Sequence, residues 1–341
     1  MIFNLQAGEV KTLPILSDKY PEDITVKQGE NAVFSAVIDE DGIPTEYTYQ
    51  WYVNDSLVSD ATTAVYTRKT DEDSGIYTVY CEITNKAGTV KTRTAQLEVD
   101  VLPTLDSTKP ANATIGVGKS VTLSVAISKH GYPKTYTYQW YKNGSKISGA
   151  TSNSYVFVAS AVGTTTFYCE VTNSAGTVKS RTATLTAVLY LLNDGQINTN
   201  VAGDIVGEAG KANKYSETHS VAPGIAKQGS QIRIRQDPGE NSGYVYFTKK
   251  INLTSYSAVS IDVYSDVPAS NASGPTFLCW KSLPHYWSED AVVHRSVNTG
   301  GVRKNVGSDI SSLSGEYYLG FGIGSSEKET NTIWLYNIIL K

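Results

Sequence analysis

Short runs of alternating hydrophobic and polar residues recur along most of the chain. Residues 32–38 (Ala-Val-Phe-Ser-Ala-Val-Ile) and 121–127 (Val-Thr-Leu-Ser-Val-Ala-Ile) both show this pattern. A period of two places every second side chain on one face, which is typical of a strand that covers a core. No long stretch has a helical period, so we predict a chain built of strands.

These strands belong to a repeat. The sequence Tyr-Thr-Tyr-Gln-Trp-Tyr occupies residues 47–52 and occurs unchanged at 136–141. Residues 81–91 and 169–179 share the pattern Cys-Glu-x-Thr-Asn-x-Ala-Gly-Thr-Val-Lys. Self-similarity of this strength predicts two copies of one small β domain in tandem.

Turn residues separate the strands at equivalent places in both copies. Asn54-Asp55 and Asn143-Gly144 follow the two tryptophan strands. Asn-Gly between strands is a strong hairpin signal. Gly88 and Gly176 lie in a second turn, which joins the cysteine strand to the last strand of each copy.

The tryptophan on a central strand, the later cysteine and the Cys-x-x-x-Asn-x-x-Gly hairpin resemble immunoglobulin-like domains, above all bacterial and phage versions. The resemblance covers about residues 20–188. It implies that Trp51 and Trp140 lie in the two cores, and that Cys81 and Cys169 are inert buried thiols.

The chain departs from the antibody pattern in two respects. Ala36 and Val125 stand where the partner cysteine would be, so we expect no disulfide between the sheets of either copy. Asp73-x-Gly75-x-Tyr77 resembles a tyrosine-corner run, but Cys81 comes two residues later than that pattern requires. We therefore do not carry the corner over to this chain.

From residue 189 the repeat stops, and a different β domain is expected. Even strand spacing with Gly, Asn and Pro turns indicates a sandwich, and residues 251–263 with a strand at the chain end resemble carbohydrate-binding jelly rolls. The predicted fold class is all-β, with two tandem immunoglobulin-like sandwiches followed by a jelly-roll-like β-sandwich. The strands predicted in the last domain are residues 231–235, 243–247, 258–264, 276–280, 317–323 and 332–340.

We assign residues 1–16 to an N-terminal docking arm, 17–101 and 102–188 to the two immunoglobulin-like domains, and 189–341 to the last domain. The connection at residues 99–103 (Val-Asp-Val-Leu-Pro) contains no Gly/Ser tract, so we expect a semi-rigid rod.

Charge and composition exclude several classes of partner. The formal net charge is −4 and 18% of residues are charged, with no basic stripe, which argues against nucleic acid. No apolar run is long enough to span a membrane, and the first residues do not form a signal peptide. The odd set of three cysteines suits a reducing compartment.

Catalytic and metal-binding motifs are missing from the sequence, so we predict no enzyme, no metal and no cofactor. The four histidines match no established ligand spacing. Asn193-Asp194-Gly195 and Asp204 could supply oxygens to Ca²⁺, but a plain turn is the favoured interpretation.

The densest aromatic cluster lies at residues 280–290 and is the predicted site. Flat rings there would cover the apolar face of a sugar, while charged neighbours, among them Lys281 and Glu289, bond its hydroxyls. An alternative interpretation places Trp280 in the core, and Trp334, between Ile333 and Leu335, is also expected in the core. The predicted ligand-binding residues are Trp280, His285, Tyr286, Trp287, Asp290 and Arg295.

Immunoglobulin-like repeats before a jelly roll resemble accessory virion proteins of tailed phages. The resemblance implies a non-enzymatic tail or capsid decoration protein, assembled in the host cytoplasm, whose partners are virion proteins and a bacterial surface glycan. A bacterial cell-surface adhesin and the binding portion of a glycan-active enzyme remain alternatives. The ligand's identity and a homo-oligomer stay open.

Overall fold

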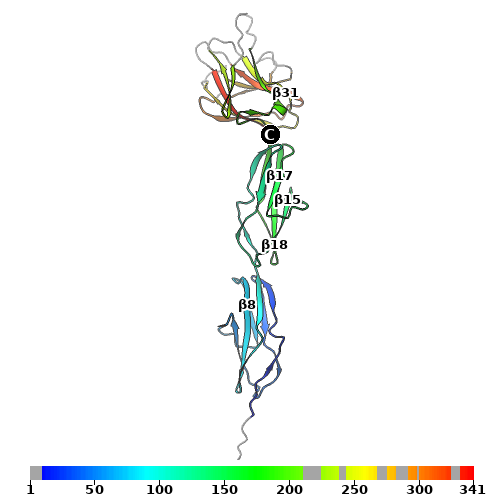
Figure 1. Ribbon diagram of the computed structural model, residues 1–341, viewed down its shortest axis with the longest axis vertical. Helices are drawn as coiled ribbons and strands as arrows, with labels where there is room; N and C mark the ends of the chain where they lie inside the picture. The colour runs from blue at the N-terminus through cyan, green and yellow to red at the C-terminus, as the bar shows by residue number, and fades with distance from the viewer. Residues whose placement is uncertain are drawn as a thin grey trace, which may run out of the picture. The chain divides into compact units, whose positions relative to one another are not determined.

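The computed structural model describes residues 10–209, 224–237, 243–266, 275–281, 291–297, 299–323 and 331–341. Strands make up nearly all of its regular structure (Figure 1). One short helix, α1 (Thr199–Ala202), is the exception among the described residues. The all-β prediction is therefore confirmed.

The first repeat contains ten strands. They are β1 (Ile15–Leu16), β2 (Ile24–Lys27), β3 (Asn31–Ser35), β4 (Ile38–Glu40), β5 (Thr48–Val53), β6 (Ser56–Leu57), β7 (Val65–Lys69), β8 (Gly75–Asn85), β9 (Gly88–Lys91) and β10 (Ala95–Asp100).

The larger sheet of this repeat has the order β2-β10-β8-β5-β6, with β9 also paired to β8. The pairs β3–β7 and β1–β4 form the opposite side. Strand pairing begins at Thr12, which bridges to Ile43 inside the segment that the sequence assigned to an arm. Residues 1–9 lie outside the described residues.

The core of the first repeat is centred on Trp51. This residue is fully buried opposite Cys81 in the register of β5 and β8. Its indole Nε1 donates to the Thr63 carbonyl at 2.8 Å, and its ring stacks on Tyr66 with centroids 5.7 Å apart. A buried indole N–H needs such a partner, so the tryptophan both fills and orients the core.

The asparagine of the repeated motif is structural. Asn85 Nδ2 donates to the carbonyl of Thr12 at 2.9 Å, and its Oδ1 accepts from Ala87 N at 2.9 Å. Asn173 Nδ2 likewise donates to the Val101 carbonyl at 2.8 Å. In each copy this side chain connects the segment before the first strand to the hairpin that follows the cysteine strand.

The second repeat repeats these strands. They are β11 (Thr104–Leu105), β12 (Ala113–Gly116), β13 (Ser120–Ser124), β14 (Ile127–Lys129), β15 (Thr137–Lys142), β16 (Ser145–Lys146), β17 (Ser154–Val158), β18 (Gly163–Asn173), β19 (Gly176–Lys179) and β20 (Ala183–Asn193).

Equivalent residues make equivalent contacts in the second core. Trp140 lies opposite Cys169, and its Nε1 donates to the Ser152 carbonyl at 2.9 Å. The large core residue changes strand, however. Phe34 and Val79 of the first copy correspond to Leu123 and Phe167 of the second, and all four are buried. Each copy therefore has one phenylalanine and one smaller aliphatic residue at this pair of positions, so the filled volume is similar.

The described residues of the C-terminal part add twelve strands. They are β21 (Gln196–Ile197), β22 (Ile205–Ala209), β23 (Gly224–Gln228), β24 (Gln231–Gln236), β25 (Gly243–Phe247), β26 (Ile251–Asn252), β27 (Ala258–Ser265), β28 (Thr276–Trp280), β29 (Ala291–Ser296), β30 (Lys304–Asp309), β31 (Glu316–Ile323) and β32 (Asn331–Leu340).

These strands form a sandwich of two antiparallel sheets. One has the order β22-β25-β31-β28-β29, and β23-β24-β32-β27-β30 run side by side in the other. Side chains from both sheets, such as Phe247, Phe321, Ile261 and Leu335, form one buried core. The six strands predicted from the sequence here are confirmed, and the jelly-roll assignment stays a prediction.

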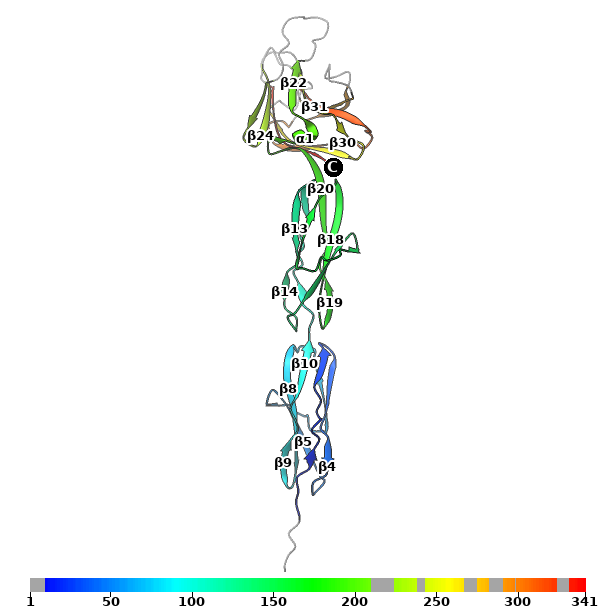
Figure 2. The ribbon, with the colours of Figure 1, turned by 45° about the vertical axis from the view of Figure 1, so that its right-hand side comes forward.

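Strand β20 belongs to two sets of pairings. Residues 185–188 pair in parallel with β12, and residues 189–193 pair with β32 of the sandwich (Figure 2). No linker separates these two parts of the strand. A Cβ at Gly116 would lie 3.1 Å from the Tyr190 ring, so a glycine makes room for this aromatic side chain.

Tyr77 corrects one sequence interpretation. Its hydroxyl donates to the Ser74 carbonyl at 3.3 Å and accepts from Ser74 N at 3.1 Å. This bond to the backbone just upstream is a local tyrosine-corner contact. The first repeat therefore has the contact that we did not carry over, although its cysteine lies further along the strand.

Candidate functional site

The structure describes two of the six predicted ligand-binding residues. Trp280 on β28 is fully buried with Tyr244, Tyr246 and Leu278, and the Tyr244 and Trp280 centroids are 5.7 Å apart. Arg295 on β29 is exposed. His285, Tyr286, Trp287 and Asp290 lie outside the described residues, so the sugar platform at residues 280–290 stays a prediction.

Trp334 does not lie in the core, contrary to the expectation from the sequence. Its neighbours Ile333 and Leu335 are both fully buried in the sandwich, whereas Trp334 is only half-buried. Since side chains alternate along a strand, Trp334 faces away from the core. It lies on the outer face of the sheet that contains β24, β32, β27 and β30.

This outer face, which we call the aromatic-polar face, has an ordered arrangement. Ala226, Arg233, Trp334 and Tyr264 lie side by side across β23, β24, β32 and β27. Tyr264 and Trp334 meet edge to face with centroids 5.0 Å apart. The pair thus presents a partly exposed aromatic surface beside an arginine.

A second row on the same face is polar. Asn337, Asp262 and Asn305 are opposite one another across β32, β27 and β30. Arg303 forms an ion pair with Asp262 and lies over the Tyr336 ring, 3.7 Å from its centroid. The Arg303 hydrogen bond holds the pKa of Asp262 below its usual value. Hydroxyl-binding groups and ring faces are therefore adjacent.

The sequence contained a signal for this face that we did not use. In Ile232-Arg233-Ile234-Arg235, in Ile333-Trp334-Leu335-Tyr336 and in Ile261-Asp262-Val263-Tyr264, the aliphatic residues alternate with aromatic or charged ones. Within one strand this pattern only sorts the side chains into two opposite faces. That the outward residues of three distant segments lie together is decided by the strand order.

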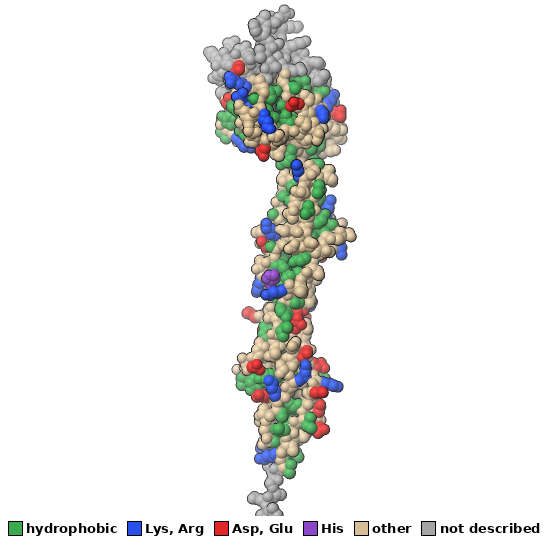
Figure 3. All heavy atoms as spheres, in the orientation of Figure 1, with side chains coloured by type: hydrophobic (Ala, Val, Ile, Leu, Met, Phe, Trp, Pro, Cys, Tyr) green, Lys and Arg blue, Asp and Glu red, His purple; other side chains and the backbone are tan. Residues whose placement is uncertain are grey.

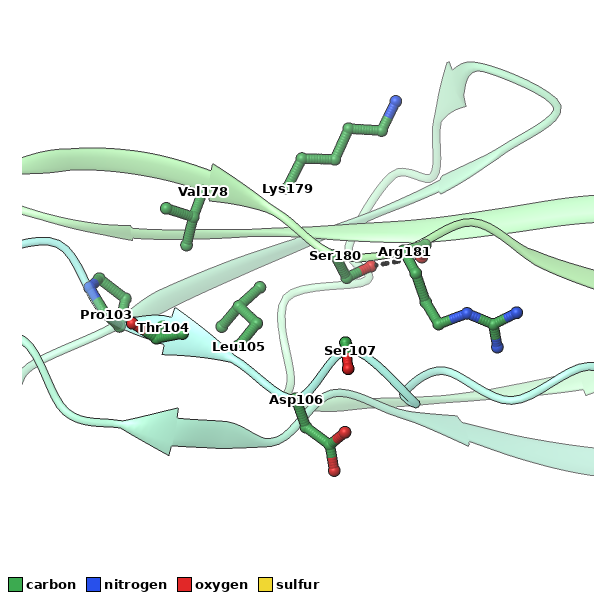
Figure 4. Close-up of a pocket in the computed structure, with 9 residues that line it drawn as sticks. All are labelled: Pro103, Thr104, Leu105, Asp106, Ser107, Val178, Lys179, Ser180 and Arg181. Atoms are coloured by element: carbon green, nitrogen blue, oxygen red, sulfur yellow. Dashed lines mark hydrogen bonds between the residues drawn. The ribbon is translucent and has the colours of Figure 1, made fainter.

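A groove in the second repeat is a weaker candidate. It has a cavity volume of about 400 Å³ between β11 and the end of β19, and Leu105 and Val178 point toward one another across it (Figure 4). Asp106 already accepts from Thr108 N and Oγ1 at 2.7 Å, and Arg181 donates to the Pro110 carbonyl at 2.7 Å. These polar groups bond to the segment between β11 and β12, two strands that belong to different sheets.

Both repeats carry the same array of two stacked tyrosines, a glutamate and a lysine. Tyr141 stacks on Tyr168 at 4.7 Å and donates to Glu170 Oε2 at 2.8 Å, while Lys179 Nζ lies 3.7 Å from the Tyr168 centroid. The equivalent array of the first repeat is Tyr52, Tyr80, Glu82 and Lys91. Because each group has a partner within the array, we interpret it as cross-strand stabilisation.

The described residues hold no cluster of His, Cys, Asp or Glu that could bind a metal ion. Asn193, Asp194 and Gly195 form the turn between β20 and β21, with positive φ at Asp194 and Gly195. This agrees with the turn interpretation of these residues. On the face that Figure 3 shows, Lys and Arg occur in small separate groups rather than in a stripe. None of the described helices has the length and apolarity needed to cross a membrane.

Comparison with known proteins identifies the class of the second repeat. Residues 102–187 match the immunoglobulin domain family. Roundabout homolog 4 of Rattus norvegicus is 34% identical over 116 residues, which cover 32% of this chain and 12% of that protein. The chain therefore spans only a small part of this relative's length.

Solved structures of low similarity were also found. The titin I67–I69 fragment is 15% identical to this chain. The match covers 70% of this chain and 94% of the titin fragment, with a TM-score of 0.39. The structure of the four N-terminal immunoglobulin domains of Dscam1 isoform 7.44 is 16% identical to this chain. The match covers 52% of this chain and 46% of the Dscam1 chain, with a TM-score of 0.35. Together, the family match and the internal repeat define tandem immunoglobulin-like sandwiches.

Proposed function

We propose that this chain is a non-enzymatic adhesion protein whose C-terminal sandwich binds a glycan on a bacterial surface. The aromatic-polar face carries the proposal. Trp334 and Tyr264 offer ring faces to the apolar side of a sugar, and Asn337, Asp262 and Arg303 offer bonds to its hydroxyls.

We further propose that the protein serves on the virion of a tailed phage, as a tail or capsid decoration. The tandem repeats, whose sequence motifs resemble bacterial and phage versions, support this function, and so do buried thiols that need no oxidising compartment. Many copies on one particle would convert weak single contacts into avidity. A bacterial surface adhesin is the alternative that shares the same binding role.

A glycan array with the full chain tests the binding proposal. We expect Trp334→Ala to weaken binding by about two- to ten-fold, which corresponds to the loss of one aromatic contact of ~0.5–1.5 kcal/mol. Leu57→Ala, which removes an exposed apolar side chain of the first repeat, is the matched control and should bind normally. Binding to no glycan, or equal binding by Trp334→Ala, would contradict the proposal.

The platform predicted at residues 280–290 is tested separately. Trp287→Ala on the same array should weaken binding if that segment contributes to the ligand contact. Unchanged binding by Trp287→Ala together with a loss in Trp334→Ala would assign the glycan to the aromatic-polar face alone.

The virion proposal has its own test. Mass spectrometry of purified particles should detect the chain, and neighbouring genes should encode tail, capsid or lysis proteins. Sortase and cell-wall genes beside it, and absence from purified particles, would favour the bacterial adhesin.

A further inference from the structure

Arg233 is the cation at the centre of the aromatic-polar face. On β24 it lies between Ile232 and Ile234, which are buried in the sandwich core, so its side chain projects outward. Across the sheet its neighbours are Ala226 on one side and Trp334 on the other.

The Nε of Arg233 is buried and has no hydrogen-bond partner among the described residues. Two other arginines of the chain show which group binds the guanidinium edge formed by Nε and one terminal nitrogen. Arg68 binds Asp73 through Nε and one terminal nitrogen, and Arg303 binds Asp262 in the same way. This paired geometry matches a carboxylate.

The carboxylates closest in sequence and register to Arg233 have other partners. Asp237 pairs with Arg235, and Asp262 pairs with Arg303. Asp266 accepts a hydrogen bond from Thr332 N at 2.8 Å. A buried donor on a charged group is costly when unpaired, so the face favours a ligand that brings an anion to Arg233.

We propose that Arg233 binds the carboxylate of an acidic saccharide whose ring packs on Trp334. The inference rests on the proposed glycan binding and names the class of glycan, one that contains uronic or related sugar acids. The planar carboxylate pairs with the half-buried guanidinium of Arg233, while the neighbouring indole covers the apolar face of the ring.

The test compares two probes with the same backbone. Isothermal titration of the full chain with a short oligogalacturonide and with its methyl ester isolates the carboxylate, because only the acid form carries charge. We expect the acid to bind about ten- to hundred-fold more tightly, as charge-assisted hydrogen bonds do. Arg233→Gln should abolish this preference, and Arg233→Lys should retain only part of it.

Arg235→Gln is the matched control. It removes the same charge from the same face of β24 but acts on an arginine that already has a carboxylate partner. The acid-over-ester preference of Arg235→Gln should stay within about two-fold of that of the unmutated chain, because salt screens the exposed charge of Arg235. Circular dichroism of each variant verifies that the sheets are intact.

The outcomes separate this inference from the proposed function. Equal affinity for acid and ester, with Arg233→Gln unchanged and Trp334→Ala impaired, overturns the acidic specificity but keeps the glycan site. Binding to a phosphodiester polymer or to an acidic peptide, but not to any sugar acid, also overturns it. Binding to no saccharide, acidic or neutral, defeats both.

Discussion

The ring of Trp334 on β32 meets that of Tyr264 on β27 edge to face, with centroids 5.0 Å apart and planes at 65°. The two residues are opposite one another in the strand register and both are half-buried. Their contact lies on the outer face of the sheet, so it orders an aromatic surface outside the core.

Mutation of this pair should reveal coupling. Tyr264→Leu is expected to lower the free energy of unfolding by about 0.5–1.5 kcal/mol through loss of the edge-to-face contact. A double-mutant cycle with Trp334→Leu, measured by urea denaturation, should give a coupling energy of that size. Additive effects of the two changes would mean that the rings do not support one another.

The Tyr141–Glu170 hydrogen bond predicts a specific titration. It is the main cause that raises the pKa of the Tyr141 phenol, as the bond to Glu82 raises the pKa of Tyr52. Glu170→Gln should therefore let Tyr141 ionise at lower pH. The measurement is an NMR titration with labelled tyrosine, in which Tyr141→Phe identifies the resonance. Glu82→Gln is the control in the other repeat and should leave Tyr141 unchanged.

The three cysteines should be unreactive in the folded protein. Burial raises the pKa of Cys81 and Cys169 to about 11 and that of Cys279 to about 12. Since the thiolate is the nucleophile, labelling with a disulfide reagent at pH 8 should be very slow until a denaturant is added. Three thiols should then react per chain. Rapid labelling of any thiol without denaturant would contradict this burial.

Gly320 on β31 should tolerate no side chain. A Cβ there would lie 2.0 Å from the carbonyl oxygen of Val245 on the neighbouring strand, so the backbone would have to shift. We expect Gly320→Ala to destabilise the protein by about 3 kcal/mol or more in thermal or urea unfolding. Gly307→Ala on β30 is the control, because its nearest neighbour would be 3.9 Å away, and its stability should change little.

The Asp262–Arg303 ion pair should contribute to stability in a pH-dependent way. The folded-state pKa of Asp262 is lowered, first by the Arg303 hydrogen bond, so its stabilisation is complete above the unfolded pKa of about 4. It is lost as pH falls through the lower, folded-state pKa. Asp262→Asn should therefore flatten the acid side of a stability–pH profile measured by urea unfolding. Arg303→Gln should flatten it similarly, and an unchanged slope in both would contradict this assignment.

The sequence alone determined the repeated part of the fold. Alternation and the Asn-Gly turn act over short distances, so they predict strands and hairpins directly. The tryptophan–cysteine spacing predicts buried rings through the resemblance to immunoglobulin-like domains. Trp51 and Trp140 are buried as expected.

Only the tertiary structure decided which outward residues lie together. Arg233, Tyr264 and Trp334 are far apart in the sequence, and their strands β24, β27 and β32 become neighbours through the order of the sheet. The local pattern around Trp334 does not say which side of its strand is covered, because both faces of a sheet strand can carry aromatic residues. The packing of the second sheet against Ile333 and Leu335 settles the side, and Trp334 is left on the outer face.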